Sequence, residues 1–322
     1  MRTRPGRWLL ALATAATATA VPGQSVAERT AALARAATVD EAMVGDDGER
    51  TETYRTYERW RDRAATADLL AALQHAAPTV RAYAARALVE REERVDWTAA
   101  LRPFLRDTAV VTTRSGCCCR EEAVGDVVFT TVRPRLTDDQ LQDFAEAAIR
   151  GRSPLYAREW ALRHLRLRDG MLHEVRALAR SGEAVAAIAL ARYRLPGDAP
   201  ILVALLRQPR PFDDSVGFLA AAEHRDPSLL PALVDLADAA RRRLESDNPS
   251  RLRFWLQAIA AQRSEPAGAF LAQFLRTLHP GNAFAEGDLL ATIAAVLEPH
   301  ADVAAFAAVR AELAQRQRAR GD

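Results

Sequence analysis

Three consecutive cysteines carry the most distinctive chemistry in this sequence. Cys117, Cys118 and Cys119 are the only cysteines among its 322 residues, and they lie in the segment Thr112–Arg120, which reads TTRSGCCCR. In an oxidising compartment cysteines usually pair, yet this sequence has no distant cysteine. An intrachain disulfide must therefore be vicinal or span Cys117 to Cys119, and vicinal disulfides strain the backbone and are easily reduced.

Three interpretations of these cysteines remain open: a buried cysteine with two incidental thiols, a redox or intermolecular disulfide role, and thiolate binding of a metal. Three adjacent residues do not readily converge on one tetrahedral ion, and no histidine lies nearby in the sequence. We therefore predict no metal site and treat Cys117, Cys118 and Cys119 as redox candidates. We expect their segment to be a loop that projects from one rim, with at least one thiol accessible.

Four arginines are candidates for binding an acidic protein partner. Arg114 and Arg120 flank the cysteines, where their charge also favours a thiolate. Arg81 and Arg158 occupy equivalent positions, just after the first apolar residue of two similar helices. For these two arginines the alternative is a structural ion pair with an Asp or Glu of the neighbouring repeat.

No other pattern in the sequence indicates catalysis. The six histidines share no metal-ligand spacing, and the sequence contains neither a phosphate-binding glycine loop nor a G-x-S-x-G element. We therefore predict no catalytic residue and no cofactor. The 44 basic residues nearly balance the 42 acidic ones, so there is no electrostatic case for binding nucleic acid.

The elements that position these residues are predicted from one recurring helical pattern. In Pro78–Glu90 the apolar residues follow the i, i+3, i+4, i+7, i+8 spacing of a helix with one buried face. Similar stripes start at Val124, Ala157, Val185, Val216, Leu252 and Leu289, and partner helices are expected between them. Two helices in each unit of about 30–45 residues indicate an all-α solenoid.

This pattern leads to four structural expectations. The solenoid should contain about seven helical pairs, and helices should include more than half of the residues. Tyr83, Trp160, Ile188 and Trp255 should be buried between its layers. Before the repeats, residues 21–50 should form an N-terminal helix over Val26–Val44 and a linker at residues 45–49. The repeat domain is expected to cover residues 51–322.

The segment PTVRAYAARAL at residues 78–88 resembles the second helix of HEAT repeats, particularly the short variety found in phycobilisome lyases. Residues 51–133 also resemble the start of bacterial HEAT-repeat proteins, many of them exported, for which no activity is established. The matching motifs here are the VRAYA helix, the Gly116-Cys117 pair and the Val124-Gly125-Asp126 tripeptide. The resemblance implies a HEAT-like fold and no catalytic residue.

The N-terminal residues predict an export signal. Arg2, Arg4 and Arg7 precede an uncharged Leu/Ala/Thr run, and Ala18-Thr19-Ala20 offers small residues at a cleavage site before Val21. Residues 1–20 are therefore read as a Sec-type signal peptide, which implies a periplasmic or secreted protein. The alternative is an ordinary amphipathic first helix. We expect no membrane span in the mature chain.

From these features we expect an exported scaffold that binds another protein, since stacked helix pairs offer a long surface without needing a cofactor. One alternative is a lyase-like or redox-active maturation factor on the same fold, which would use the cysteine segment. A second alternative is a purely structural array within a larger envelope complex.

Overall fold

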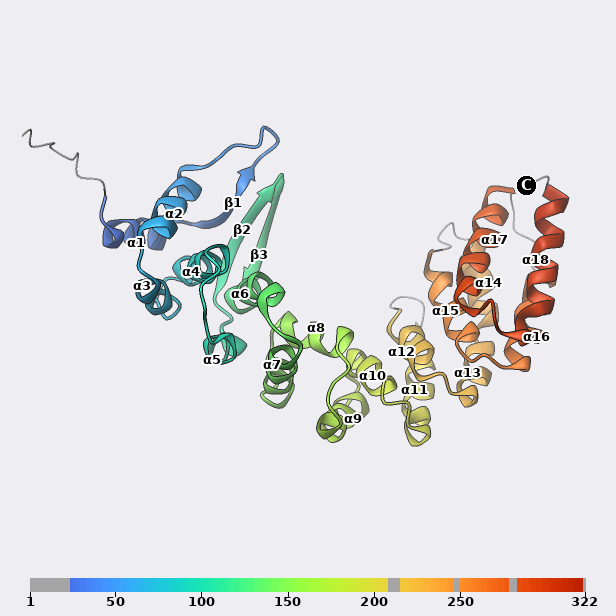
Figure 1. The fold of residues 1–322 in the computed structure, drawn as a ribbon. Coiled ribbons are helices and arrows are strands. Elements are labelled where there is room, and N and C mark those ends of the chain that lie inside the picture. The colour runs from blue at the N-terminus through green and yellow to red at the C-terminus, as the bar shows by residue number, and fades with distance from the viewer. Residues whose placement is uncertain (1–23, 208–214, 246–249, 278–282, 321–322) are drawn as a thin grey trace, which may run out of the picture.

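The structure is a computed structural model that describes residues 24–207, 215–245, 250–277 and 283–320. Helices make up 70% of it, so the prediction of a mostly helical chain is confirmed. Figure 1 shows the helices following one another along a curved path, with a small sheet near the N-terminal end and α18 at the other end. The predicted signal peptide, residues 1–20, lies outside the described residues.

The bounds of the α-helices are as follows: α1 Val26–Arg35, α2 Glu52–Arg63, α3 Thr66–Ala72, α4 Pro78–Glu90, α5 Trp97–Leu101, α6 Val124–Val132, α7 Asp138–Arg150, α8 Tyr156–His164, α9 Leu172–Arg180, α10 Ala184–Ala191, α11 Ala199–Leu206, α12 Val216–His224, α13 Leu230–Val234, α14 Ala237–Glu245, α15 Ser250–Ala260, α16 Glu265–Thr277, α17 Ala283–Leu297 and α18 Ala307–Arg320. The strands are β1 Thr38–Val44, β2 Val110–Gly116 and β3 Cys118–Ala123.

The three-stranded sheet departs from the all-α prediction. β1 runs parallel to β2, which pairs with β3 in an antiparallel hairpin. The helix expected over Val26–Val44 therefore ends at Arg35, and the loop expected over Thr112–Arg120 is mostly hairpin. Asp40 of β1 and Arg114 of β2 are 74 residues apart in the chain. The backbone N–H and C=O groups of these strands form hydrogen bonds with residues far away in the chain. Local composition does not predict which distant segment will pair with a strand.

The segment before residue 51 packs into the same core as the helices that follow it. Leu33 of α1 and Val39 of β1 are buried in one apolar cluster with residues of α2 and α4. The Thr79 hydroxyl of α4 donates a hydrogen bond of 2.8 Å to the backbone carbonyl of Leu33. A short turn at residues 45–48 then leads from β1 toward α2.

Helix α4 lies at the centre of this N-terminal core. Pro78 occupies its first turn, where a missing N–H costs no intrahelical bond. α1, α3 and α6 all pack against α4. Burial therefore extends around much of the helix, and it includes the whole predicted stripe: Val80, Tyr83, Ala84, Ala87 and Leu88.

The helices that carry the recurring stripe pack against one another in chain order. α4 contacts α6, α6 contacts α8, and α8 contacts α10, which in turn contacts α12; α12 then packs on α15, and α15 on α17. Intervening helices form further contacts of the same kind, such as α5 with α7 and α16 with α18. Each apolar face is thus buried by a near neighbour in the sequence, and the core extends along the whole curved path.

Three of the four side chains expected between layers are buried, namely Tyr83, Ile188 and Trp255. The prediction for Trp160 is wrong, because this residue is only half-buried. Its indole packs at a steep angle against Phe129, with 5.3 Å between ring centroids, and the Arg133 guanidinium lies 4.8 Å from its ring centroid. A cation over the ring face is favourable for a partly exposed indole.

Truncation of the central helix provides a test of the core. We expect Leu88→Ala to lower the free energy of unfolding by about 2–5 kcal/mol, because it opens a cavity at a side chain with no solvent exposure. The matched control is Leu70→Ala in α3, where the side chain is 39% exposed and the loss should be well below that range. Urea unfolding followed by circular dichroism measures both. Equal losses at the two positions would show that Leu88 is not part of a tightly packed core.

Candidate partner-binding groove

The candidate site is built around the β2–β3 hairpin. The two strands pair in regular register from Val110 opposite Ala123 to Ser115 opposite Cys118. Gly116 adopts a φ of +52° at the turn, a left-handed conformation that glycine accepts without a Cβ clash. The hairpin therefore holds the predicted candidates Arg114, Cys118 and Arg120 on ordered strands rather than on a loop.

A buried carboxylate fixes this hairpin to β1. Asp40 has no exposed side-chain surface, and it receives two hydrogen bonds from Arg114, with Nε–Oδ1 at 2.8 Å and Nη2–Oδ2 at 2.6 Å. The Thr51 hydroxyl donates a third at 2.6 Å. Burial by itself would raise the pKa of Asp40, but the hydrogen bonds from Arg114 and Thr51 outweigh it and hold that pKa below its usual value.

The same strand is tied to α4 through Tyr83. The backbone N–H of Asp40 donates a hydrogen bond of 2.7 Å to the Tyr83 hydroxyl oxygen. Arg86, one turn further along α4, donates to the Asp40 carbonyl at 3.1 Å. The backbone of β1 is therefore bonded to α4 at the residue whose carboxylate binds Arg114.

Between the sheet and the helices lies a groove of about 470 Å³, which we call the hairpin groove. Its walls come from β1, from both strands of the hairpin, from α4 and from α6, and it brings together three of the predicted candidates. The charged and reactive side chains that line it, together with one hydroxyl, are Glu41, Arg86, Arg114, Cys118, Arg120, Glu122 and Thr130. This volume lies within the range of pockets that bind a small ligand or a few side chains of a partner.

Arg86 is held by acidic neighbours on α4 and β1. Its Nε lies 2.6 Å from Glu90 and its Nη2 lies 3.2 Å from Glu41. Arg61 and Tyr57 also donate to Glu90, at 2.6 and 2.8 Å. Burial alone would raise the pKa of Glu90, yet these three donors outweigh it and lower that pKa. The charge of Arg86 is thus largely neutralised within the protein.

Arg120 differs from the other two arginines of the groove. Its side chain is exposed, and no carboxylate in the described ranges forms an ion pair with it. Its cross-strand neighbour is Thr113, whose hydroxyl donates to Glu122 at 2.5 Å. A guanidinium without an internal partner can form a charge-assisted hydrogen bond with an incoming carboxylate. Arg120 is therefore the cation of the groove that is open to a partner.

All three cysteines are exposed, so the interpretation of a buried cysteine is wrong and the prediction of an accessible thiol is confirmed. The Sγ atoms of Cys117 and Cys118 lie 3.9 Å apart, which is a contact and not a bond. Cys118 lines the hairpin groove. In the part of the chain that the structure describes, no three His, Cys, Asp or Glu side chains are grouped so that they could hold a metal ion.

Arg81 does not reach the hairpin groove. Its guanidinium forms two hydrogen bonds with Asp107, of 2.8 and 2.9 Å, and donates to the carbonyls of His75 and Ala76. Because Asp107 lies between α5 and β2, this pair links neighbouring helical units. The intramolecular alternative is therefore the observed one for Arg81.

Arg158 also forms an internal ion pair, with Glu183 at 3.0 Å. A comparable pair joins Arg176 to the buried Asp198, with oxygens 2.6 and 2.9 Å from the guanidinium nitrogens. These ion pairs connect successive parts of the helical array. The structure thus separates Arg81 and Arg158 from Arg114 and Arg120, which the sequence had grouped as one set of candidates.

The Val124-Gly125-Asp126 motif is structural. A Cβ on Gly125 would lie 2.3 Å from the Phe104 carbonyl oxygen, so only glycine allows α6 to start this close to the preceding turn. The Asp126 carboxylate accepts hydrogen bonds from the backbone N–H groups of Tyr156 and Ala157, at 3.2 and 3.0 Å. It therefore caps the N-terminus of α8 and joins the third stripe helix to the second.

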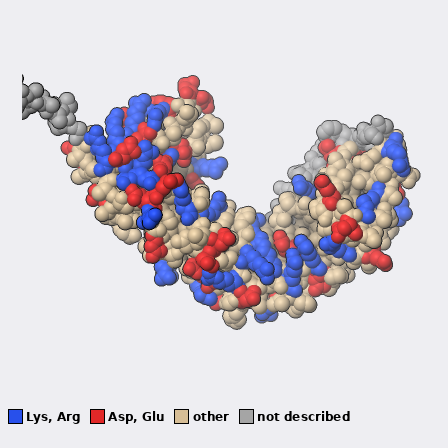
Figure 2. All heavy atoms as spheres, in the orientation of Figure 1, with Lys and Arg blue, Asp and Glu red and all other residues tan. Residues whose placement is uncertain are grey.

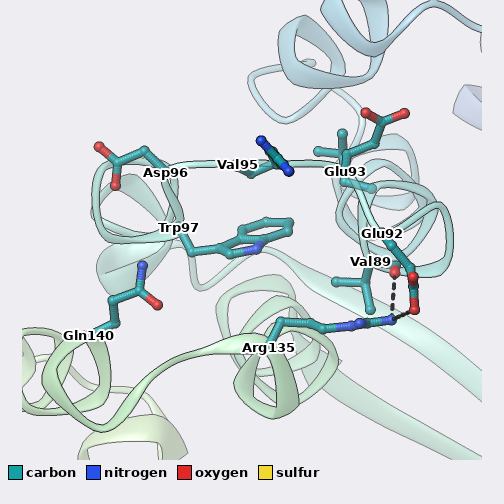
Figure 3. Close-up of a pocket in the computed structure, with 10 residues that line it drawn as sticks. Val89, Glu92, Glu93, Val95, Asp96, Trp97, Arg135 and Gln140 are labelled. Atoms are coloured by element: carbon teal, nitrogen blue, oxygen red, sulfur yellow. Dashed lines mark hydrogen bonds and ion pairs between the residues drawn. The ribbon is translucent and has the colours of Figure 1, made fainter.

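A second pocket, also of about 470 Å³, lies between α4, α5 and α7. Figure 3 shows Trp97 across its centre, with Arg135 reaching Val89 and Glu92 on one side and Gln140 on the other. Arg135 donates to the Val89 carbonyl at 3.2 Å and to Glu92 at 3.0 Å. The Arg135 guanidinium caps a carbonyl at the C-terminal end of α4, so it stabilises the helix terminus and is not available to an incoming ligand.

Sequence reasoning missed β1 and the buried Asp40. The segment Thr38–Val44 has β-branched and apolar residues at several positions, a weak strand signal that the preceding alanine-rich run conceals. It also missed Arg86, because a helical arginine gives no sign of which strand it faces. Arg114 and Arg120 were correctly placed near the cysteines by their position in the chain.

No family model matches the chain, and no curated protein or solved structure is significantly similar to it. None of the helices within the described ranges combines the length and the apolar character that crossing a membrane requires.

The Asp40–Arg114 pair provides a second test. We expect Asp40→Asn to lower the free energy of unfolding by about 2–3 kcal/mol, below the range for a fully buried pair, because Arg114 is 32% exposed. The folded-state pKa of Asp40 is lowered, so its contribution is present at neutral pH and is lost as pH falls below about 4.

Urea unfolding at pH 7 and pH 3 measures this loss. Glu121→Gln is the matched control, since Glu121 is exposed on β3 and its substitution should change stability little. A loss from Asp40→Asn that is the same at both pH values would show that the charge of Asp40 does not stabilise the sheet.

Proposed function

We propose that this chain is an exported HEAT-like α-solenoid of about seven helical pairs that acts as a protein-interaction scaffold. The observation that carries the proposal is the packing of the stripe helices in chain order, from α4 to α17. Such an array exposes a long surface relative to its core, and repeat proteins use that surface to bind other chains.

The turns between helices support the repeat interpretation. Arg194, Arg225 and Arg263 follow α10, α12 and α15, and all three have a positive φ, of 53°, 58° and 48°. A left-handed residue after a helix lets the chain reverse direction within a few residues. The same device at three successive stripe helices is expected of one structural unit repeated along the chain.

The hairpin groove is the proposed contact for the partner. The β2–β3 hairpin that forms one of its walls is inserted between helices of the array. In repeat proteins such insertions tend to lie on the face that binds a partner. Arg120 is the open cation of the groove, and Thr130 on α6 adds an exposed hydroxyl. Figure 2 shows charged side chains of both signs gathered over the N-terminal helices, so charge alone does not select a partner there. An acidic, extended segment of a protein fits Arg120 best.

A redox-active maturation factor is the second candidate function. Its support is the exposure of Cys118 beside Arg120 in the hairpin groove, where a partner thiol or disulfide could approach. Thiol–disulfide exchange needs an accessible thiolate and no further cofactor. The two functions differ in outcome, because a scaffold retains its partner whereas a redox factor releases it in a changed oxidation state.

Charge reversal in the groove tests the scaffold proposal. The full chain without its first 20 residues is immobilised and exposed to a periplasmic extract, and retained proteins are quantified by mass spectrometry. We expect one acidic protein to be retained stoichiometrically, and Arg120→Glu to reduce its retention about tenfold, because a charge-assisted hydrogen bond is worth about 1.5–3 kcal/mol.

Arg102→Glu is the matched control for this experiment. Arg102 is exposed near α5 and does not line the hairpin groove, so its reversal should leave retention unchanged. Equal losses for both variants would indicate a nonspecific charge effect. Retention that requires a cysteine and disappears with reductant, with Arg120→Glu unaffected, would favour the redox function.

Export is the remaining part of the proposal, and its support is the basic and then apolar start of the sequence. When the full chain is expressed in a bacterium with a Sec pathway, the protein recovered from the periplasm should begin at or near Val21. N-terminal sequencing makes this measurement. Recovery of the uncleaved chain from the cytoplasm alone would contradict export and favour an ordinary first helix.

A further inference from the structure

The outer edge of β3 is open. Across the described residues β3 pairs with β2 and with no other strand, so one row of its backbone N–H and C=O groups faces away from the sheet. Its first four residues, Cys118 to Glu121, are all exposed. Figure 1 shows the hairpin projecting from the helices with its turn at the free end. An exposed edge of this kind is a template for another strand.

From this edge we infer that two copies of the chain associate through β3, strand against strand and antiparallel, to form one six-stranded sheet about a two-fold axis. The strand is regular, without proline and without a bulge in its pairing with β2. A second copy is the occupant that brings an equally open edge, and Cys118 to Arg120 at the start of each β3 would form the paired stretch. The association is separate from the proposed scaffold function, which depends on the hairpin groove.

Charge selects the register of this pairing. When two identical strands pair about a two-fold axis, the residue on the axis faces its own copy. Centring on Arg120 or on Glu121 would place like charges directly opposite each other, which is unfavourable. Centring on Cys119 places Arg120 opposite Cys118 of the second copy and brings Glu121 beside Cys117, in the turn that precedes β3. This register has no like-charge pair.

The same register brings the two Cys119 thiols together. Residues directly opposite in an antiparallel pair have Cα atoms about 4.5–5.5 Å apart, within the range that a disulfide requires. In β3 Cys119 alternates with Cys118, so its side chain points to the other face of the strand, away from the residue that lines the groove. Cys118 and Arg120 therefore face the groove, whereas Cys119 lies on the face of its cross-strand neighbour Arg114, whose guanidinium binds Asp40.

An oxidant such as glutathione disulfide can make this pairing covalent. One Cys119 thiolate attacks the glutathione disulfide, forms a mixed disulfide and releases one glutathione. The Cys119 thiolate of the second copy then attacks the cysteine sulfur of that mixed disulfide and releases a second glutathione. Two protein thiols are oxidised to one disulfide, two electrons reduce the glutathione disulfide, and the two protons are taken up by the released thiolates.

A set of single-cysteine proteins tests the register. Each variant keeps one native cysteine and has serine at the other two positions, so Cys117→Ser/Cys118→Ser retains Cys119. In a glutathione redox buffer we expect this variant to form disulfide-linked dimer about tenfold faster than those that retain Cys117 or Cys118, because pairing raises the local thiol concentration. Non-reducing gel electrophoresis follows the rate, and circular dichroism verifies folding.

A second pair of variants tests the strand pairing without Cys119. Cys118→Ser/Cys119→Ser/Glu121→Cys retains Cys117, which in the inferred register faces position 121 of the other copy, so it should cross-link. Cys118→Ser/Cys119→Ser/Arg120→Cys is the matched control, because in the inferred register position 120 faces position 118 of the other copy and not Cys117. It should cross-link about tenfold more slowly.

Several outcomes would overturn the inference. Equal rates for the three single-cysteine proteins would indicate random collision of exposed thiols. Formation of an intrachain bond between Cys117 and Cys118 in the wild type, with no dimer from any variant, would indicate a monomeric redox switch at the turn. Faster cross-linking of the Arg120→Cys control than of the Glu121→Cys variant would place the two strands in a different register.

Discussion

The need of each stripe helix to bury its apolar face governs this structure. Helices such as α4 and α10 are buried on most of their surface, which a single helical pair could not achieve. They are covered by the stripe helices before and after them, as α10 is by α8 and α12. Stability is therefore shared between neighbours along the chain, and the molecule extends along a curved path instead of closing on itself.

Charged side chains link these neighbours without contributing much apolar surface. Arg81 with Asp107, Arg158 with Glu183 and Arg176 with Asp198 each join one helical unit to the next. Arg81 and Arg158 had the residue type and the position expected of a binding surface, yet their ion pairs lie within the chain. A charge that is already paired contributes to the order of the array, and it is a poor site for a partner.

Within the described residues the three-stranded sheet departs from helical packing, and a buried carboxylate stabilises it. Asp40 would be costly to bury alone, but Arg114 and Thr51 supply the hydrogen bonds that compensate for lost water. This network fixes the hairpin against α4, and among the described residues the outer edge of β3 has no strand partner. The groove and the open edge of β3 therefore both result from the way this network holds the hairpin. The groove presents Arg120 to one kind of partner, and the open edge presents Cys119 to another.

The sequence by itself determined the helices. Their apolar spacing is a local property, so α4, α6, α8, α10, α12, α15 and α17 follow from residues within one or two turns of each other. Only the tertiary structure decided the sheet, the pairing of Asp40 with Arg114 and the separation of Arg81 from the groove. These depend on contacts between residues far apart in the chain, and neither composition nor spacing records which distant group a side chain will meet.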